Sequence, residues 1–163
     1  MQNITPFLWF DENAEEAVNF YVATFKNSKI GSVNRWGKGG SVLTIEFALD
    51  GTEFVALNGG RTKPDGEELG SEFDLKASSA VSFVVSCKTQ GDVDEVWDKL
   101  LPGGKPMQCG WIRDKYGVTW QIVPEGMVEL FHDPDRERSQ RAMAAMMEME
   151  KLDIDAMRKA AAG

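Results

Sequence analysis

The chain has 163 residues, of which 42% are hydrophobic and 27% charged, an ordinary balance for one globular domain or two small modules. Its net charge is -8 at pH 7, and no basic stripe is present, so nucleic acid and anionic membrane surfaces are not expected partners. The two separated cysteines, the absence of a signal-like N-terminus and the lack of a long apolar run predict a soluble, cytoplasmic protein with reduced thiols.

The chain opens with a pattern typical of a strand followed by a helix. Residues 4–10 are apolar and rich in aromatic side chains, which favours a strand. Asn13, with Glu16 three residues later, predicts a capping box at the start of a helix. Apolar residues then recur at helical spacing as far as Phe25, so the helix should bury one face.

Three strands and a polar segment are expected next. The strands are predicted at residues 29–36, 41–49 and 52–58. The last two should pair as a hairpin, because Asp50-Gly51 between them favours a type I′ turn. Residues 61–79 are polar and rich in glycine, which predicts a linker or loop.

The same order of elements begins again near residue 80. Alternation over 80–87 predicts a half-buried strand, and Asp92 with Glu95 predicts the start of a second capped helix. Further strands are expected at 105–113 and 118–123, around a turn at 114–117, with 127–131 as a weak candidate for the last strand.

The remaining residues predict a helical tail. Asp133-Pro134 is typical of a helix start, and no breaker interrupts residues 136–162, which favours one long helix or two helices kinked near Asp153. Methionines concentrate here, either for core and dimer packing or as an adaptable peptide-binding surface. The predicted organisation is α+β, with βαβββ modules at 1–60 and 80–131, a linker at 61–79 and a tail at 132–163.

Three stretches carry a family resemblance: FDENAEEAVNFYVATF at 10–25, GWIRDKYGVTWQIVP at 110–124 and RAMAAMMEMEKLDIDAMRKA at 141–160. They resemble the PhnB-like, or 3-demethylubiquinone-9 3-methyltransferase-like, branch of the glyoxalase, bleomycin-resistance and dioxygenase (vicinal oxygen chelate) superfamily. The resemblance implies two βαβββ modules that form an incomplete mixed barrel with a concave face. It also implies a homodimer, whose modules pair within one chain or swap between two.

Metal-dependent members of the superfamily hold a catalytic ion with histidine and glutamate on the concave strands. Alignment by motif places the three ligand slots of this chain at Thr5, Ala80 and Gln121. A hydroxyl, a methyl group and a neutral amide are poor ligands for a divalent transition metal. The expectation is therefore no metal and no cofactor, and the only histidine, His132, is expected to make surface or cap contacts.

Strand alternation from these slots predicts a concave pocket with aromatic walls and a few polar groups, typical of a small-molecule site. The binding residues expected to line it are Thr5, Phe7, Trp9, Trp36, Glu46, Ala80, Ser82, Trp111, Arg113 and Gln121. For Arg113, an ion pair with Asp114 at the surface and an anion clamp are both open. Glu46 is either a solvent-facing strand residue or a general base.

Three functions are consistent with this pattern. The first is metal-free binding of a small molecule. The second is an enzyme that uses Glu46 as the base on a small polar substrate. The third is an interaction protein that works through its methionine-rich tail. Methyl transfer is not expected, because no glycine-rich turn follows a strand and opens a helix.

Overall fold

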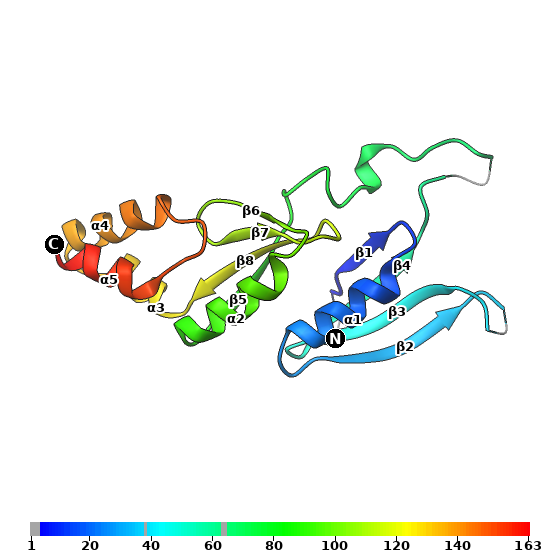
Figure 1. Cartoon of the computed structure of the whole chain (residues 1–163), viewed down its shortest axis with the longest axis horizontal. Coiled ribbons are helices and arrows are strands. Elements are labelled where there is room, and N and C mark those ends of the chain that lie inside the picture. The colour runs from blue at the N-terminus through cyan, green and yellow to red at the C-terminus, as the bar shows by residue number, and fades with distance from the viewer. Residues whose placement is uncertain (1–3, 38, 63–64) are drawn as a thin grey trace. The chain divides into compact units, whose positions relative to one another are not determined.

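The computed structural model describes residues 4–37, 39–62 and 65–163. The chain forms two compact units, Met1–Ser78 and Ser79–Gly163, each built on a four-stranded sheet (Figure 1). Small parts of the predicted first module and linker, namely residues 1–3, 38 and 63–64, lie outside the described residues. No helix in the described ranges is long and apolar enough to cross a bilayer.

The first unit has the predicted βαβββ order. Its elements are β1 (Phe7–Phe10), α1 (Ala14–Thr24), β2 (Lys29–Arg35), β3 (Val42–Leu49) and β4 (Thr52–Asn58), followed by a short 3-10 turn at Ser71–Phe73. The strand order is β1-β4-β3-β2, with β1 parallel to β4 and the other pairs antiparallel. Asp50 (φ 45°) and Gly51 (φ 79°) both adopt the positive φ that a type I′ turn requires, so the predicted hairpin is confirmed.

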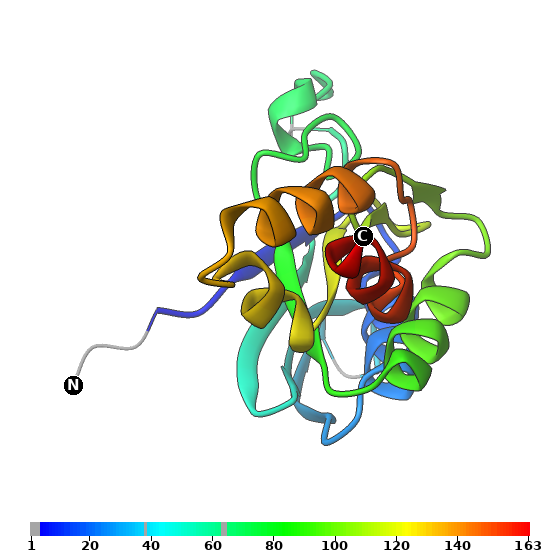
Figure 2. The same ribbon diagram turned by 90° about the vertical axis from the view of Figure 1, so that its left-hand side faces the viewer.

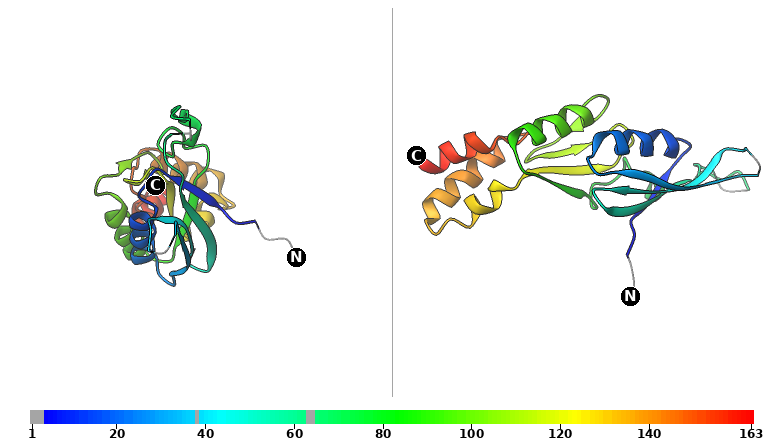
Figure 3. Two further views of the ribbon diagram at one scale, coloured as in Figure 1. Left: turned by 90° about the vertical axis from the view of Figure 1, so that its right-hand side faces the viewer. Right: turned by 90° about the horizontal axis from the view of Figure 1, so that it is seen from below.

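Helix α1 covers one face of this sheet (Figure 3). Tyr21 is fully buried, and its ring stacks on Phe47 with centroids 6.4 Å apart. The helix starts after Asn13 as expected, but the predicted capping box is wrong, because the Asn13 side chain makes no cap hydrogen bond. Asn58, at the end of β4, accepts a hydrogen bond from the Ala14 N–H at 2.8 Å instead, so a tertiary contact satisfies the first turn.

The second unit repeats the topology. Its elements are β5 (Phe83–Cys87), α2 (Gln90–Leu100), β6 (Lys105–Pro106), β7 (Trp111–Arg113) and β8 (Thr119–Pro124), in the strand order β5-β8-β7-β6. The N-cap of α2 is Thr89, not the predicted Asp92. Asp92 is the third helical residue, and its carboxylate completes a capping box with Thr89. The two α+β modules are thus confirmed, and neither sheet closes into a barrel.

Residues 105–113 were predicted as one strand but form two, β6 and β7. The second of these completes the four-stranded module. Cys109 (φ 62°) and Gly110 (φ 81°) are left-handed and lie in the turn between β6 and β7. Their N–H groups donate to the carbonyls of Met149 and Glu150, both at 2.7 Å. A contact with a distant segment therefore divides this stretch into β6 and β7.

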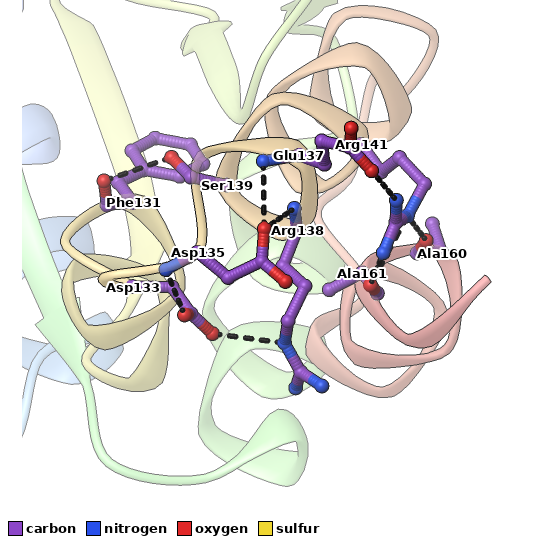
Figure 4. Close-up of polar contacts among 9 residues, drawn as sticks. All are labelled: Phe131, Asp133, Asp135, Glu137, Arg138, Ser139, Arg141, Ala160 and Ala161. Carbon is purple, nitrogen blue, oxygen red and sulfur yellow. Dashed lines mark hydrogen bonds and ion pairs between the residues drawn. The ribbon is translucent and has the colours of Figure 1, made fainter.

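Three helices follow β8, namely α3 (Gly126–Phe131), α4 (Arg136–Met147) and α5 (Ile154–Ala162), and they face the viewer in Figure 2. The candidate strand at 127–131 is wrong, because these residues form α3. The two-helix alternative is confirmed, and Asp153 is the N-cap of α5. Arg141 of α4 donates to the carbonyl oxygens of Ala160 and Ala161 and so caps the end of α5 (Figure 4).

The segment before α5 docks on α2. Gln90 donates to the Leu152 carbonyl (2.9 Å) and accepts from the Ile154 N–H (3.0 Å). Lys151 lies 2.9 Å from Asp94. The hydrogen bond from Lys151 lowers the pKa of Asp94 below its usual 3.8, and the same contact raises the pKa of Lys151 above 10.5.

Candidate functional site

The face of the first sheet opposite α1 carries three of the ten residues that the sequence assigned to a pocket, Phe7, Trp9 and Glu46. Paired residues on neighbouring strands point to the same face. The register gives two cross-strand rows on this open face, Phe7–Val55–Glu46 and Trp9–Leu57–Thr44. The alternating residues Leu8, Ile45 and Phe47 are buried on the α1 side. The predicted strand parity is therefore correct for Phe7, Trp9 and Glu46.

A hollow of about 360 Å³ lies on this open face. Its lining residues are Thr5, Lys29, Gly31, Glu46, Phe47, Ala48, Glu53, Phe54 and Val55. At Gly31 the strands β2 and β3 approach closely, since an added Cβ would lie 3.1 Å from the Glu46 carbonyl oxygen. Thr5 and Glu46 were predicted for the site, whereas Lys29 and Glu53 were missed because only the strand pairing places them beside Ala48.

Glu46 is the candidate base in this hollow. Its side chain is exposed and, within the ranges that the structure describes, makes no ion pair or side-chain hydrogen bond. Lys29 of β2 and Glu53 of β4 supply the other charges of the lining. The hollow can therefore offer a carboxylate acceptor and an ammonium donor to a polar molecule.

Trp9 does not line this hollow, because a segment of its own unit covers it. Its indole N–H donates to the Gly60 carbonyl at 3.1 Å, and its ring lies 4.9 Å from that of Phe73. A Cβ at Gly59 would fall 2.1 Å from the indole ring, so only glycine allows this packing. Trp36, expected at the rim, follows β2 and is 64% exposed.

The open face of the second sheet is polar. Its cross-strand rows are Val84–Gln121–Trp111 and Thr119–Arg113–Lys105. Gln121 donates from Nε2 to Ser82 Oγ at 2.8 Å. Arg113 donates from Nη2 to Ser79 Oγ at 2.6 Å, and Thr119 Oγ1 lies 3.2 Å from the same oxygen. Of the five pocket residues predicted in this unit, Trp111, Arg113 and Gln121 thus lie on this face, and Ser82 is hydrogen-bonded to Gln121. The fifth, Ala80, lies before β5.

Asp114 is not the surface partner expected for Arg113. It is 3% exposed, and its carboxylate accepts from the N–H groups of Tyr116 (2.8 Å) and Val118 (3.1 Å). Its second oxygen accepts from Trp120 Nε1 at 2.8 Å. The aspartate therefore shapes the turn before β8 and leaves Arg113 on the open face.

The three superfamily ligand slots do not fit a transition metal. Thr5 and Ala80 are exposed and offer a hydroxyl and a methyl group, and Gln121 offers a neutral amide, which is a weak ligand for such an ion. Among the described residues, no three His, Cys, Asp or Glu side chains are grouped so that they could hold a metal ion. His132 is exposed, with Nδ1 2.8 Å from the Val128 carbonyl oxygen.

The sequence profile of the 3-demethylubiquinone-9 3-methyltransferase family matches residues 2–123. The chain belongs to this family. The 32% identical relative described below is a PhnB protein, so the resemblance to the PhnB-like family found in the sequence is confirmed. The match ends near β8, so the predicted resemblance at 141–160 lies outside the matched residues. No protein of curated function matches the chain.

Solved structures of one PhnB protein and of more distant proteins share the fold. A putative 3-demethylubiquinone-9 3-methyltransferase, PhnB protein, from Bacillus cereus is 32% identical, with a TM-score of 0.62; the alignment covers 76% of this chain and 99% of that one. A Pseudomonas aeruginosa protein is 15% identical over 77% and 98% of the two chains, with a TM-score of 0.58. The fosfomycin resistance protein FosX of Listeria monocytogenes is 11% identical over 78% and 94%, with a TM-score of 0.50. The last two show the fold alone.

Proposed function

We propose that this PhnB-like protein binds a small polar molecule on the open faces of its sheets without the catalytic metal of its superfamily. The observation that carries the proposal is the chemistry of the ligand slots. Thr5 offers a hydroxyl, Ala80 offers no donor atom, and Gln121 offers only a neutral amide, whose nitrogen donates to Ser82. The hollow beside Glu46 supports a small ligand, because it combines open volume with a few charged groups.

A thermal-shift screen of small polar compounds, run with and without EDTA, tests this proposal. Ligands should raise the melting temperature equally in both arms, since no metal bridges them to the protein. Chemical-shift mapping should then place the ligand on open-face residues such as Glu46 or Gln121. Stabilisation that EDTA abolishes and manganese or zinc restores would overturn the proposal.

A second candidate is an enzyme in which Glu46 acts as a general base. Its support is the position of the carboxylate in the hollow, with the Lys29 ammonium in the same lining. If substrate screening finds a turnover, Glu46→Gln should abolish it, while Glu12→Gln, an exposed residue outside the hollow, should not. An unchanged rate in Glu46→Gln rejects the role.

Literal methyl transfer gains no support from the fold. Inside the two modules, the strand-to-helix connections are residues 11–13 and 88–89, and neither contains glycine. A nucleotide-type cofactor is usually held by a glycine-rich turn at this place. We therefore take the family name as inherited by similarity.

We also propose that the protein is a cytoplasmic homodimer. Exposed apolar side chains support self-association, among them Phe7 (57% exposed) and Val84 (60%) on the open faces and Met147 (59%) on α4. Sedimentation equilibrium of the full chain should give twice the monomer mass. A monomer at micromolar concentration would contradict the dimer. The alternative partner surface on the tail rests on the exposed Met143 and Met147, and deleting the residues beyond Asp133 distinguishes the two roles.

A further inference from the structure

The hollow on the open face of the first sheet places one short apolar side chain among three long charged ones. Ala48 of β3 lines it and lies in a cross-strand row between Lys29 of β2 and Glu53 of β4. Glu46, two residues earlier on β3, points to the same face. Ala48 is only 7% exposed although it lies on the open face, so it forms part of the floor. This arrangement fits a recess of about 360 Å³.

The three charges of the hollow are not neutralised within the described ranges of the chain. Lys29, Glu46 and Glu53 are exposed there and make no ion pair or side-chain hydrogen bond. Two carboxylates and one ammonium give the lining a net charge of -1. Glu46 pairs with Val55, so Glu53 is its diagonal neighbour, with about 7–8 Å between the Cα atoms. Long side chains can meet at this distance, so one cation can contact both carboxylates.

An organic ammonium group suits this hollow better than a metal ion. A calcium ion takes about six to eight oxygen ligands, whereas the lining holds two carboxylates. In the part of the chain that the structure describes, no three His, Cys, Asp or Glu side chains are grouped to hold a metal. An ammonium group carries three donors and needs only acceptors. Ala48 and Val55 can contact the hydrocarbon that carries it.

We propose that the hollow binds a small amine, with the ligand's ammonium group between Glu46 and Glu53. Lys29 lies across Ala48 from Glu53 and donates to an acidic group of the same ligand. The favoured class is therefore a short zwitterion that resembles an amino acid. Lys29 and Glu53 start two strands apart, about 10 Å, which leaves room for a molecule of a few carbons. This inference rests on the proposed function and deepens it by naming the ligand class.

Amide chemical-shift titration of the full 18.1 kDa chain at pH 7 tests the ligand class. The probes are propylamine, 3-aminopropanoate and propanoate, which share a three-carbon chain, each compared with sodium chloride at equal ionic strength. Propylamine and 3-aminopropanoate should shift the amides of Glu46, Ala48 and Glu53 saturably, with the zwitterion the tighter of the two. Propanoate should give no saturable shifts.

Variants of the exposed charges separate the hollow from the general attraction of a cation to a chain of net charge -8. Glu46→Gln and Glu53→Gln should each weaken propylamine binding by about 3-fold, the size expected of an exposed charge contact. Glu12→Gln, an exposed glutamate of the same unit outside the hollow, is the matched control and should leave the binding unchanged. Lys29→Gln should remove the advantage of 3-aminopropanoate over propylamine without weakening propylamine.

The proposal is overturned if propylamine gives no saturable shifts at these residues, or if the double variant Glu46→Gln/Glu53→Gln binds it as well as the native chain. It is also overturned if Glu12→Gln weakens binding as much as the two hollow variants do, or if propanoate binds more tightly than propylamine. Failure here leaves metal-free binding intact if other compounds still bind an open face without a metal. Stoichiometric bound metal rejects the proposed function whatever the amines do.

Discussion

The buried carboxylate of Asp114 should be one of the most sensitive positions in the second unit. Each of its oxygens accepts from a buried or turn N–H group: Oδ1 from Tyr116 and Val118, and Oδ2 from Trp120. A buried donor left without its partner costs about 1–3 kcal/mol. Asp114→Asn should keep the first two bonds but set its amide N–H₂ against the Trp120 N–H, a loss of about 1–3 kcal/mol. Asp114→Ala removes both acceptor oxygens and all three hydrogen bonds, and it should cost about 3–5 kcal/mol, since such losses are not additive.

Urea unfolding followed by far-ultraviolet circular dichroism measures these changes in the free energy of unfolding. A double-mutant cycle with Trp120→Phe isolates the indole bond. In the Trp120→Phe background, Asp114→Asn should cost about 1 kcal/mol less than in the native chain. Hydrogen exchange at the Tyr116 and Val118 amides should accelerate in Asp114→Ala. A cost below about 0.5 kcal/mol for Asp114→Asn, equal in both backgrounds, would refute the role given to this carboxylate.

Two further predictions concern packing and charge. Gly59→Ala should destabilise the first unit by about 1–3 kcal/mol, because its Cβ would overlap the Trp9 ring, whereas Gly91→Ala, with no atom closer than 3.7 Å, should stabilise α2 by up to about 1 kcal/mol. Thermal denaturation compares the two, and equal melting temperatures would count against the Trp9 packing. Asp94→Asn should lower stability slightly at pH 7. Because the pKa of Asp94 is lowered in the folded state, the stability that its carboxylate contributes is complete above pH 3.8 and is lost as the pH falls through the folded-state pKa. The difference between the urea midpoints of the native chain and the variant should therefore disappear in that pH range. A gap that persists at strongly acidic pH would show that the contact with Lys151 is not the cause.

The elements set by local chemistry were predictable from sequence. The Asp50-Gly51 turn adopts the expected backbone because both residues tolerate positive φ, and the register of its hairpin follows. The open-face assignment of Phe7, Trp9 and Glu46 was correct because strand alternation fixes which side chains share a face. Both α1 and α2 were placed by their apolar spacing.

The errors arose where a distant segment decides the local structure. Asn13 fits a cap by sequence, but Asn58 supplies the hydrogen bond from another strand. Residues 105–113 have a strand-like pattern, yet Cys109 and Gly110 form a turn inside this stretch, where their N–H groups donate to the carbonyls of Met149 and Glu150. No local pattern encodes such contacts.

The candidate site shows the same limit. Thr5 and Glu46 were predicted in the hollow, but Lys29 and Glu53 join it only through strand pairing. In the second unit, Arg113 was predicted, whereas Ser79 lies before β5 and Lys105 on a two-residue strand, where periodicity carries little information. The assembly of residues from both modules around one pocket stays a prediction.

Elemental analysis tests the metal-free account most directly. The protein should be produced without a histidine tag, in medium supplemented with zinc, nickel, manganese and iron, and desalted before measurement. We expect each metal well below one equivalent per chain, because a hydroxyl, a methyl group and a neutral amide replace the superfamily's ligands. A transition metal that remains bound in stoichiometric amount would contradict the account.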